Sequence, residues 1–176
     1  MEHAIKSLIR NIPDFPKPGI QFKDITPVLS DSTALKNLIE WFKLSIEAAG
    51  EVELIVGIES RGFIIGSALA HEMGIGFVPI RKPGKLPYET ESASYELEYG
   101  KDSVEIHVDA VHQGQRVALV DDLLATGGTA EAACRLLKNL GAEIVAVAFL
   151  IELDALKGRK KLKNTISENI FSLIHY

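Results

Sequence analysis

The chain has 176 residues and a formal net charge of −5 at pH 7. That length suits one compact domain, and that charge argues against nucleic acid or an anionic membrane surface as the main partner. The N-terminus lacks the apolar core of a secretory signal, and no stretch approaches the roughly 20 apolar residues of a membrane span. The single cysteine, Cys134, lies in an apolar helical stretch and is expected to be buried rather than nucleophilic. We therefore expect a cytoplasmic protein that folds without disulfides.

The first 29 residues are predicted to form a helix followed by a proline-rich segment. Apolar residues at helical spacing predict a short amphipathic helix over residues 2–11, and the prolines at positions 13, 16 and 18 then argue against regular structure. Segment 18–27 carries one isolated aromatic, Phe22, between Gln21 and Lys23. Phe22 either anchors a strap packed over the core or belongs to a binding site, and the residues alone leave both readings open.

A helix over about residues 32–49, ended by Gly50, precedes the first predicted strand at residues 54–58. The turn after that strand reads Glu59-Ser60-Arg61-Gly62, and a second helix is expected from residue 63 to about residue 73. An arginine at a helix start opposes the helix dipole unless an anion binds there. Arg61 therefore indicates an anion site.

A third short strand is predicted at residues 76–80, and a dense basic patch follows it. The patch contains Arg81, Lys82 and Lys85. A solvated run of charge is one interpretation. The position of the patch after a strand, in an acidic protein, favours an anionic ligand instead.

Residues 86–108 show a different pattern, in which apolar and polar residues alternate on both sides of Gly100. This alternation predicts a β-hairpin or β-ribbon within a chain that otherwise alternates strands and helices. A long polar arm without a core of its own is a candidate for a lid over an active site.

The most informative stretch is residues 117–130. Residues 117–120 are an unbroken apolar run that predicts a strand buried on both faces, and a helix is expected over 130–140. Asp121 and Asp122 are placed where the strand should end, at the edge of a parallel sheet where ligands bind. The turn that follows can present backbone N–H groups to a phosphate at the helix N-terminus, and it consists of Ala125, Thr126, Gly127, Gly128 and Thr129.

A monophosphate bound by this turn would leave the two carboxylates about one sugar away, where they could accept hydrogen bonds from vicinal ribose hydroxyls. The alternative is that the acidic pair only caps the helix and the glycines only turn the chain. A further buried strand is expected at 144–151 and a closing strand at 170–176, while residues 157–163 are most simply a solvated basic face.

The strands near residues 54, 76, 117 and 144, with helices between them, predict an α/β fold with a doubly wound parallel sheet and flanking helices. We expect one domain over residues 1–176. Within it, residues 1–29 form the N-terminal segment and residues 82–108 form the ribbon.

The stretch at 117–130 resembles the phosphoribosyl-pyrophosphate signature of type I phosphoribosyltransferases, and its wording is similar to that of the branch acting on adenine. The resemblance extends from Pro16 to about Lys161. It implies formation of AMP and diphosphate from adenine and 5-phospho-α-D-ribose 1-diphosphate (PRPP), with Mg²⁺ held mainly by the substrate rather than by a protein metal site. It also implies a homodimer, with residues 1–29 contributing a hood over the base.

The resemblance also implies roles for individual residues. Asp121, Asp122 and Ala125 to Thr129 would bind the ribose and 5′-phosphate, and a cis peptide is expected at Glu59–Ser60. Phe22 would stack on adenine, opposite Leu153, while the backbone of Gln21 and Lys23 reads the edge of the base. Diphosphate would be bound by Glu59, Ser60, Arg61, Lys82 and Lys85, and the catalytic set would be Glu98, Tyr99 and Arg61.

Two other functions stay open at this stage. A phosphoribosyltransferase for another base would keep the phosphate loops and change the base contacts. A PRPP-sensing regulator that binds nucleic acid would need a helix-turn-helix extension or a broad basic face, and this acidic sequence shows neither.

Overall fold

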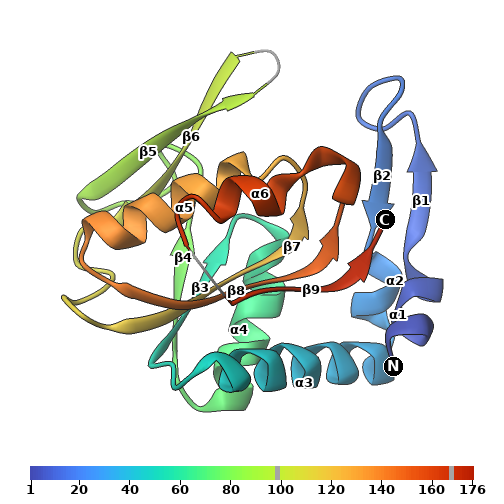
Figure 1. Cartoon of the computed structure of the whole chain (residues 1–176), viewed down its shortest axis with the longest axis horizontal. Coiled ribbons are helices and arrows are strands. Elements are labelled where there is room, and N and C mark those ends of the chain that lie inside the picture. Colours follow the sequence, from blue (N-terminus) through green and yellow to red (C-terminus); the bar gives the residue numbers. More distant parts are fainter. Residues whose placement is uncertain (98–99, 167–168) are drawn as a thin grey trace.

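A five-stranded parallel sheet forms the centre of the molecule (Figure 1). The computed structural model describes residues 1–97, 100–166 and 169–176. Each pair of neighbouring strands is parallel, which confirms the predicted α/β fold. The strand order across the sheet is β4 (Gly76–Ile80), β3 (Leu54–Ile58), β7 (Arg116–Leu124), β8 (Glu143–Glu152) and β9 (Ile170–His175).

Helices cover both faces of this sheet, and each face buries its own apolar cluster. The unbroken apolar run in β7 serves both clusters, because Val117 and Leu119 point to one face while Ala118 and Val120 point to the other. In Figure 1, α5 and α6 lie above the sheet and α3 lies below it. The helices are α1 (Glu2–Leu8), α2 (Thr26–Ser30), α3 (Ser32–Ala49), α4 (Arg61–Met73), α5 (Gly128–Asn139) and α6 (Gly158–Leu162), with a 3-10 turn, η1, at Asp154–Leu156.

Helix α3 illustrates how the local sequence sets an element's limits. The Asp31 carboxylate accepts a hydrogen bond from the Ala34 amide at 2.8 Å, and Gly50 follows the last turn with φ of 147°. Leu38, Phe42 and Ile46 share the buried face of the helix. Within the described ranges, no helix is both long enough and apolar enough to cross a membrane.

The predicted ribbon is confirmed as β5 (Thr90–Leu97) paired antiparallel with β6 (Gly100–His107). The expectation of a long polar arm is only partly right, because one face of the ribbon packs on the core of the domain. Ala93, Tyr95, Val104 and Ile106 are buried in the same apolar cluster as α5. The ribbon is therefore a packed part of the fold along its inner face.

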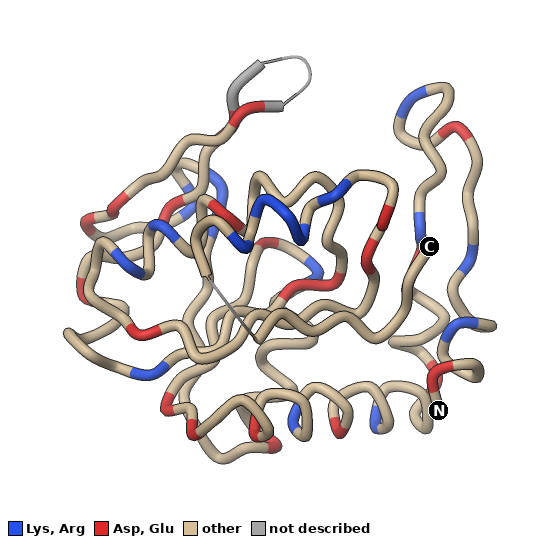
Figure 2. The backbone as a smooth tube through the Cα atoms, in the orientation of Figure 1, with Lys and Arg blue, Asp and Glu red and all other residues tan. Residues whose placement is uncertain are grey.

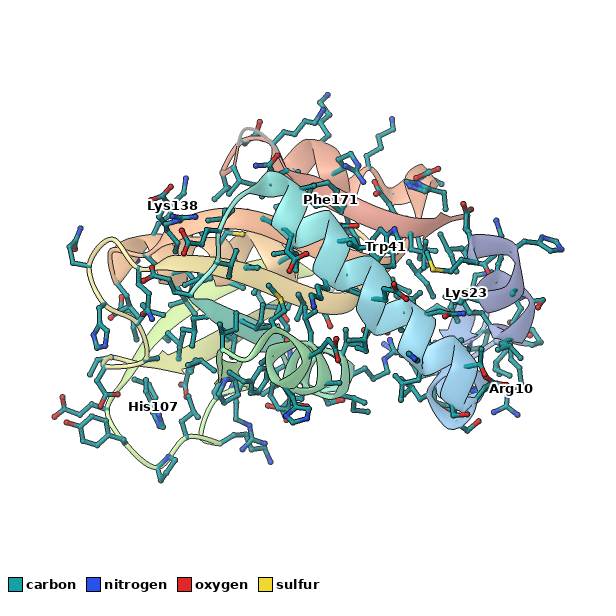
Figure 3. The ribbon with its side chains drawn as sticks, turned by 90° about the horizontal axis from the view of Figure 1, so that it is seen from below. Arg10, Lys23, Trp41, His107, Lys138 and Phe171 are labelled. Atoms are coloured by element: carbon teal, nitrogen blue, oxygen red, sulfur yellow. The ribbon has the colours of Figure 1, made fainter. Side chains whose placement is uncertain are left out.

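The N-terminal segment differs from its prediction. The helix ends at Leu8, and β1 (Arg10–Pro13) and β2 (Gln21–Asp24) then form a two-stranded antiparallel sheet. Proline is tolerated here because both strands of a two-stranded sheet are edge strands, where a missing N–H need not break the pairing. Figure 3 shows Arg10 and Lys23 at one end of the molecule and His107, on the ribbon, at the other.

Candidate active site

A cavity of about 520 Å³ lies beside the carboxyl ends of β3 and β7. It brings together the turn after β3, the end of β7, the loop before α5, one residue after β4 and one residue of β2. The residues that line it are Phe22, Glu59, Ser60, Arg61, Lys82, Asp121, Asp122, Leu123, Leu124, Ala125, Thr126, Gly127, Gly128, Thr129 and Ala130.

Both predicted carboxylates line this cavity, but they lie within β7 rather than after it. The strand continues to Leu124 because β8 pairs with it over this stretch, with Asp121 opposite Phe149 and Leu124 opposite Glu152. The Asp121 carboxylate accepts a hydrogen bond from the Asp122 amide at 2.9 Å. Strand geometry therefore fixes both side chains at the sheet edge.

Asp122 is buried, Asp121 is half-buried, and the two negative charges repel each other. Burial raises the pKa of Asp121 well above its ordinary value, and the negative charge of Asp122 raises it further. Burial also raises the pKa of Asp122, although the Arg61 guanidinium acts in the opposite direction. Arg61 Nη2 lies 2.8 Å from Asp122 Oδ2, but among the described residues that oxygen has no hydrogen-bond partner of good geometry. It can therefore still accept a hydrogen bond from a ligand hydroxyl.

The loop before α5 has the backbone expected of a phosphate cradle. Gly127 stands at the N-cap with φ of 80°, a conformation that favours glycine, and the described residues supply no side-chain cap there. The first N–H groups of α5 have no intrahelical partners, and they form the positive end of the helix dipole. An anion at this position would satisfy them.

The cradle is supported from behind by α6, a contact that the sequence did not predict. A Cβ atom added to Gly158 would lie 2.2 Å from the Ala125 carbonyl oxygen, and one added to Gly127 would lie 2.7 Å from the Gly158 carbonyl oxygen. The backbones of the two segments thus approach as closely as glycine allows. The only signal in the sequence was a glycine within a basic run.

The interpretation of residues 157–163 as a solvated face is only partly right. Figure 2 shows basic residues gathered on α6, and Lys160 is exposed. Arg159 instead bonds to the buried Glu152 carboxylate on β8, with Nε 3.0 Å from Oε1, and to the Ile170 carbonyl on β9. Burial alone would raise the pKa of Glu152, but hydrogen bonds from Arg159 and Ser172 outweigh burial and lower it. This ion pair anchors α6, and through it the cradle, to the sheet.

The turn after β3 contains the expected cis peptide bond between Glu59 and Ser60. Ser60 and Arg61 line the cavity, and Arg61 packs over the Phe22 ring, with its guanidinium carbon 4.8 Å from the ring centre. Arg61 Nη1 also donates to the Lys23 carbonyl at 3.4 Å. Arg61 thus connects the β2 segment to the acidic pair on β7.

Glu59 organises the neighbouring basic loop. Its carboxylate accepts from the Lys82 amide at 2.9 Å and pairs with the Arg81 guanidinium at 3.3 Å. Burial alone would raise the pKa of Glu59, but these two donors outweigh burial and lower it. The side chain is therefore a carboxylate at neutral pH that holds the basic loop against the cavity.

The two lysines of the basic patch differ in position. Lys82 lines the cavity, whereas Lys85 is exposed and its carbonyl accepts a hydrogen bond from Arg81. The Lys82 ammonium bonds to Tyr95 Oη at 2.7 Å and to the Asp102 carboxylate, both on the ribbon.

Of the residues predicted to contact adenine, Phe22 alone lines the cavity. The other three belong to the described part of the chain and lie just outside it. Gln21 accepts a hydrogen bond from Asn11, the Lys23 ammonium lies 3.7 Å from the centre of the Tyr176 ring, and the Leu153 amide donates to the cavity residue Leu124 at 2.9 Å. Glu98 and Tyr99 lie outside the described residues.

One group of possible metal ligands occurs within the described ranges, and it lies outside the cavity lining. It comprises Glu152, Asp154 and His175. Both Glu152 oxygens already accept from Arg159, and His175 Nδ1 lies 2.8 Å from Asp154 Oδ1. Cys134 is buried, as predicted, and burial raises the pKa of its thiol to about 12.

Residues 28–174 match the family model described as phosphoribosyl transferase domain. The chain is 54% identical over 172 residues to the adenine phosphoribosyltransferase of Acetivibrio thermocellus, across 98% of this chain and 99% of that protein. The crystal structure of adenine phosphoribosyltransferase from Thermoanaerobacter pseudethanolicus matches with a TM-score of 0.95 at 54% identity, covering 100% of both chains. The Saccharomyces cerevisiae adenine phosphoribosyltransferase, solved with an iminoaltritol bisphosphate and adenine, matches with a TM-score of 0.91 at 42% identity, across 98% of this chain and 97% of that chain.

Proposed function

This chain belongs to the phosphoribosyl transferase family, and we propose that its cavity makes AMP and diphosphate from adenine and PRPP. The reaction is a pentosyl transfer that serves purine salvage. One observation carries the assignment to this cavity: a glycine-containing loop at a helix N-terminus, an acidic pair, a cationic turn and an aromatic ring from four different segments line the same space.

The cradle of Ala125 to Thr129 binds the 5′-phosphate through its backbone N–H groups. The adjoining acidic pair accepts hydrogen bonds from the two ribose hydroxyls. The Asp122 carboxylate supports this role, because it is buried and its Oδ2, although paired with Arg61, accepts no hydrogen bond of good geometry from the described residues.

In the chemical step the bond from ribose C1 to the diphosphate oxygen breaks and leaves its electron pair on the diphosphate, a bond from C1 to the adenine nitrogen forms, and the proton lost from adenine passes to the diphosphate or to water. Positive charge develops on the sugar while negative charge accumulates on the leaving diphosphate. Arg61 and Lys82, with the backbone at Ser60, stabilise the leaving group, and the carboxylates of the acidic pair lie near the developing positive charge. Glu98 and Tyr99 retain catalytic roles in this proposal on the strength of the sequence resemblance.

Phe22 provides a flat apolar surface for adenine. Its ring already stacks against the Arg61 guanidinium on one side, so the aromatic face lies beside the cationic turn where C1 must react. The lid role of the ribbon and the edge contacts from Gln21, Lys23 and Leu153 are parts of the same proposal.

The residues at the cavity fit a magnesium ion that takes most of its ligands from the substrate and water. The oxygen donors offered by Asp121 and Asp122 are hard ligands of the kind that Mg²⁺ prefers, but they are too few to complete an octahedral shell. When bound with PRPP, the ion would neutralise diphosphate charge. The resemblance of the sequence supports a homodimer, which sedimentation velocity would test, and cell fractionation would test the expected cytoplasmic location.

The decisive experiment incubates the purified protein with PRPP, Mg²⁺ and one base at a time: adenine, hypoxanthine, guanine, xanthine or orotate. We expect AMP and diphosphate from adenine, with little product from the other bases. Product from another base would retain the phosphate sites and refute the base assignment. Tight PRPP binding without turnover on any base would favour a sensing role.

A further inference from the structure

One cation that lines the cavity, Lys82, already bonds to the ribbon. Lys82 belongs to the cavity lining, yet its ammonium bonds to Asp102 on β6 and Tyr95 on β5, and neither of these lines the cavity. Tyr95 Oη also donates to Asp102 Oδ2 at 2.8 Å, which closes a triangle of three side chains.

Packing and a backbone hydrogen bond fix the Tyr95 and Asp102 side chains of this triangle. The Tyr95 side chain is 6% exposed and packs in the cluster under α5, and Asp102 Oδ1 accepts from the Ser103 amide at 2.8 Å. Burial alone would lower the pKa of Lys82, but its bonds to Asp102 and Tyr95 outweigh burial and raise it. Lys82 is therefore fully charged, and it has a well-oriented carboxylate as its counter-ion.

We propose that Asp102 is a positioning residue that competes with diphosphate for Lys82, so that the substrate must displace Asp102 before Lys82 can bind the leaving group. The inference rests on the proposed role of Lys82 in the diphosphate site. A lysine ammonium has three donors, but the carboxylate and the diphosphate are both anionic and repel each other at one cation. Part of the binding free energy of diphosphate is therefore used to break the Lys82–Asp102 pair.

The proposal predicts that altering Asp102 changes the affinity for diphosphate in an unusual direction. A residue that only supports the site should weaken diphosphate binding when it is altered. Asp102→Asn removes the competing charge while keeping a similar shape, and it should instead tighten diphosphate binding by about threefold to fivefold, which is what the loss of a part-exposed ion pair allows. Asp102→Ala should act in the same direction.

The test measures the Kd of inorganic diphosphate with Mg²⁺ at fixed ionic strength by calorimetry, using the full chain. Asp109→Asn is the matched control, because Asp109 is exposed just beyond β6 and its replacement removes the same unit of charge. A second pair of variants carries Lys82→Ala with and without Asp102→Asn. If Asp102 acts through Lys82, the tightening seen with Lys82 present should shrink below twofold when Lys82 is absent.

The outcomes separate the two proposals. Weaker or unchanged diphosphate binding by folded Asp102→Asn would overturn the competition while leaving the diphosphate site intact. Equal tightening with and without Lys82 would show a general charge effect and would also overturn it. If Lys82→Ala alone leaves the Kd unchanged, the assignment of Lys82 to the diphosphate site is wrong, and the competition is refuted with it.

Discussion

The contact between α6 and the phosphate cradle can be disrupted by adding a single carbon atom, the Cβ of an alanine at position 158. Replacing Gly158 with alanine places a Cβ atom 2.2 Å from the Ala125 carbonyl oxygen, which belongs to backbone and cannot rotate away. Ordinary contact at such a position begins at 3.4 Å, so α6 or the cradle must withdraw by about 1.2 Å. The ion pair between Arg159 and Glu152 resists movement of α6, and we expect the cradle to yield.

This displacement should lower the free energy of unfolding by about 1–3 kcal/mol, the usual cost of overpacking. Its effect on function should be larger, because a shift of about 1 Å in a binding loop can cost about 100-fold in rate. We therefore expect Gly158→Ala to raise the Kd of PRPP and to lower kcat/KM for PRPP by up to about 100-fold.

The assay compares PRPP binding by calorimetry and steady-state kinetics, after circular dichroism has shown that the variant is folded. Lys160→Ala is the matched control, because it changes an exposed residue of the same helix. If Gly158→Ala binds PRPP as tightly as Lys160→Ala does, α6 does not support the cradle and the reasoning fails.

Three further outcomes follow from the site. Burial and the charge of Asp122 raise the pKa of Asp121, so the folded chain holds the carboxyl proton of Asp121 more tightly than the unfolded chain does. The contribution of Asp121 to stability therefore falls as pH rises above about 4. Asp121→Asn should therefore raise Tm at pH 7.5 by roughly 3 °C while impairing turnover, and a lower Tm would contradict this. Phe22→Leu should raise KM for adenine about tenfold through lost stacking and leave KM for PRPP within twofold, and equal changes in both would refute the stacking role. The pKa of Glu152 is lowered, so the stability from its pair with Arg159 is present above about pH 4 and is lost as pH falls through that pKa. Glu152→Gln should lower the free energy of unfolding by about 3 kcal/mol in urea at pH 7. It should also reduce the fall of that free energy at acid pH.

Much of the fold could be predicted because its signals are local. The apolar run of β7 and the glycines of the cradle each lie within a few residues, and strand order then brings the turn after β3 to the same sheet edge. The cis peptide at Glu59–Ser60 was expected only through resemblance to a known family. No pattern of composition or spacing predicts it.

The missed features depend on residues that are distant in sequence. The Gly158 backbone packs against the Ala125 carbonyl, and Lys82 forms an ion pair with Asp102. No periodicity in the sequence indicates either contact. The extra length of β7 depends on its pairing with β8. The N-terminal hairpin was missed because proline statistics describe central strands better than edge strands.

The charges around the cavity are arranged in pairs, and this arrangement shapes how an anionic substrate can bind. Arg61 faces Asp122, Arg81 faces Glu59 and Lys82 faces Asp102. A substrate that engages such a cation replaces one anionic partner with another, so its affinity reflects the difference between two ion pairs rather than the full attraction of a free cation. A site built in this way can bind a highly charged substrate in the correct orientation and still release highly charged diphosphate. Removing Asp102 from its pair should then strengthen diphosphate binding at the expense of turnover, whereas removing Lys82 should weaken both.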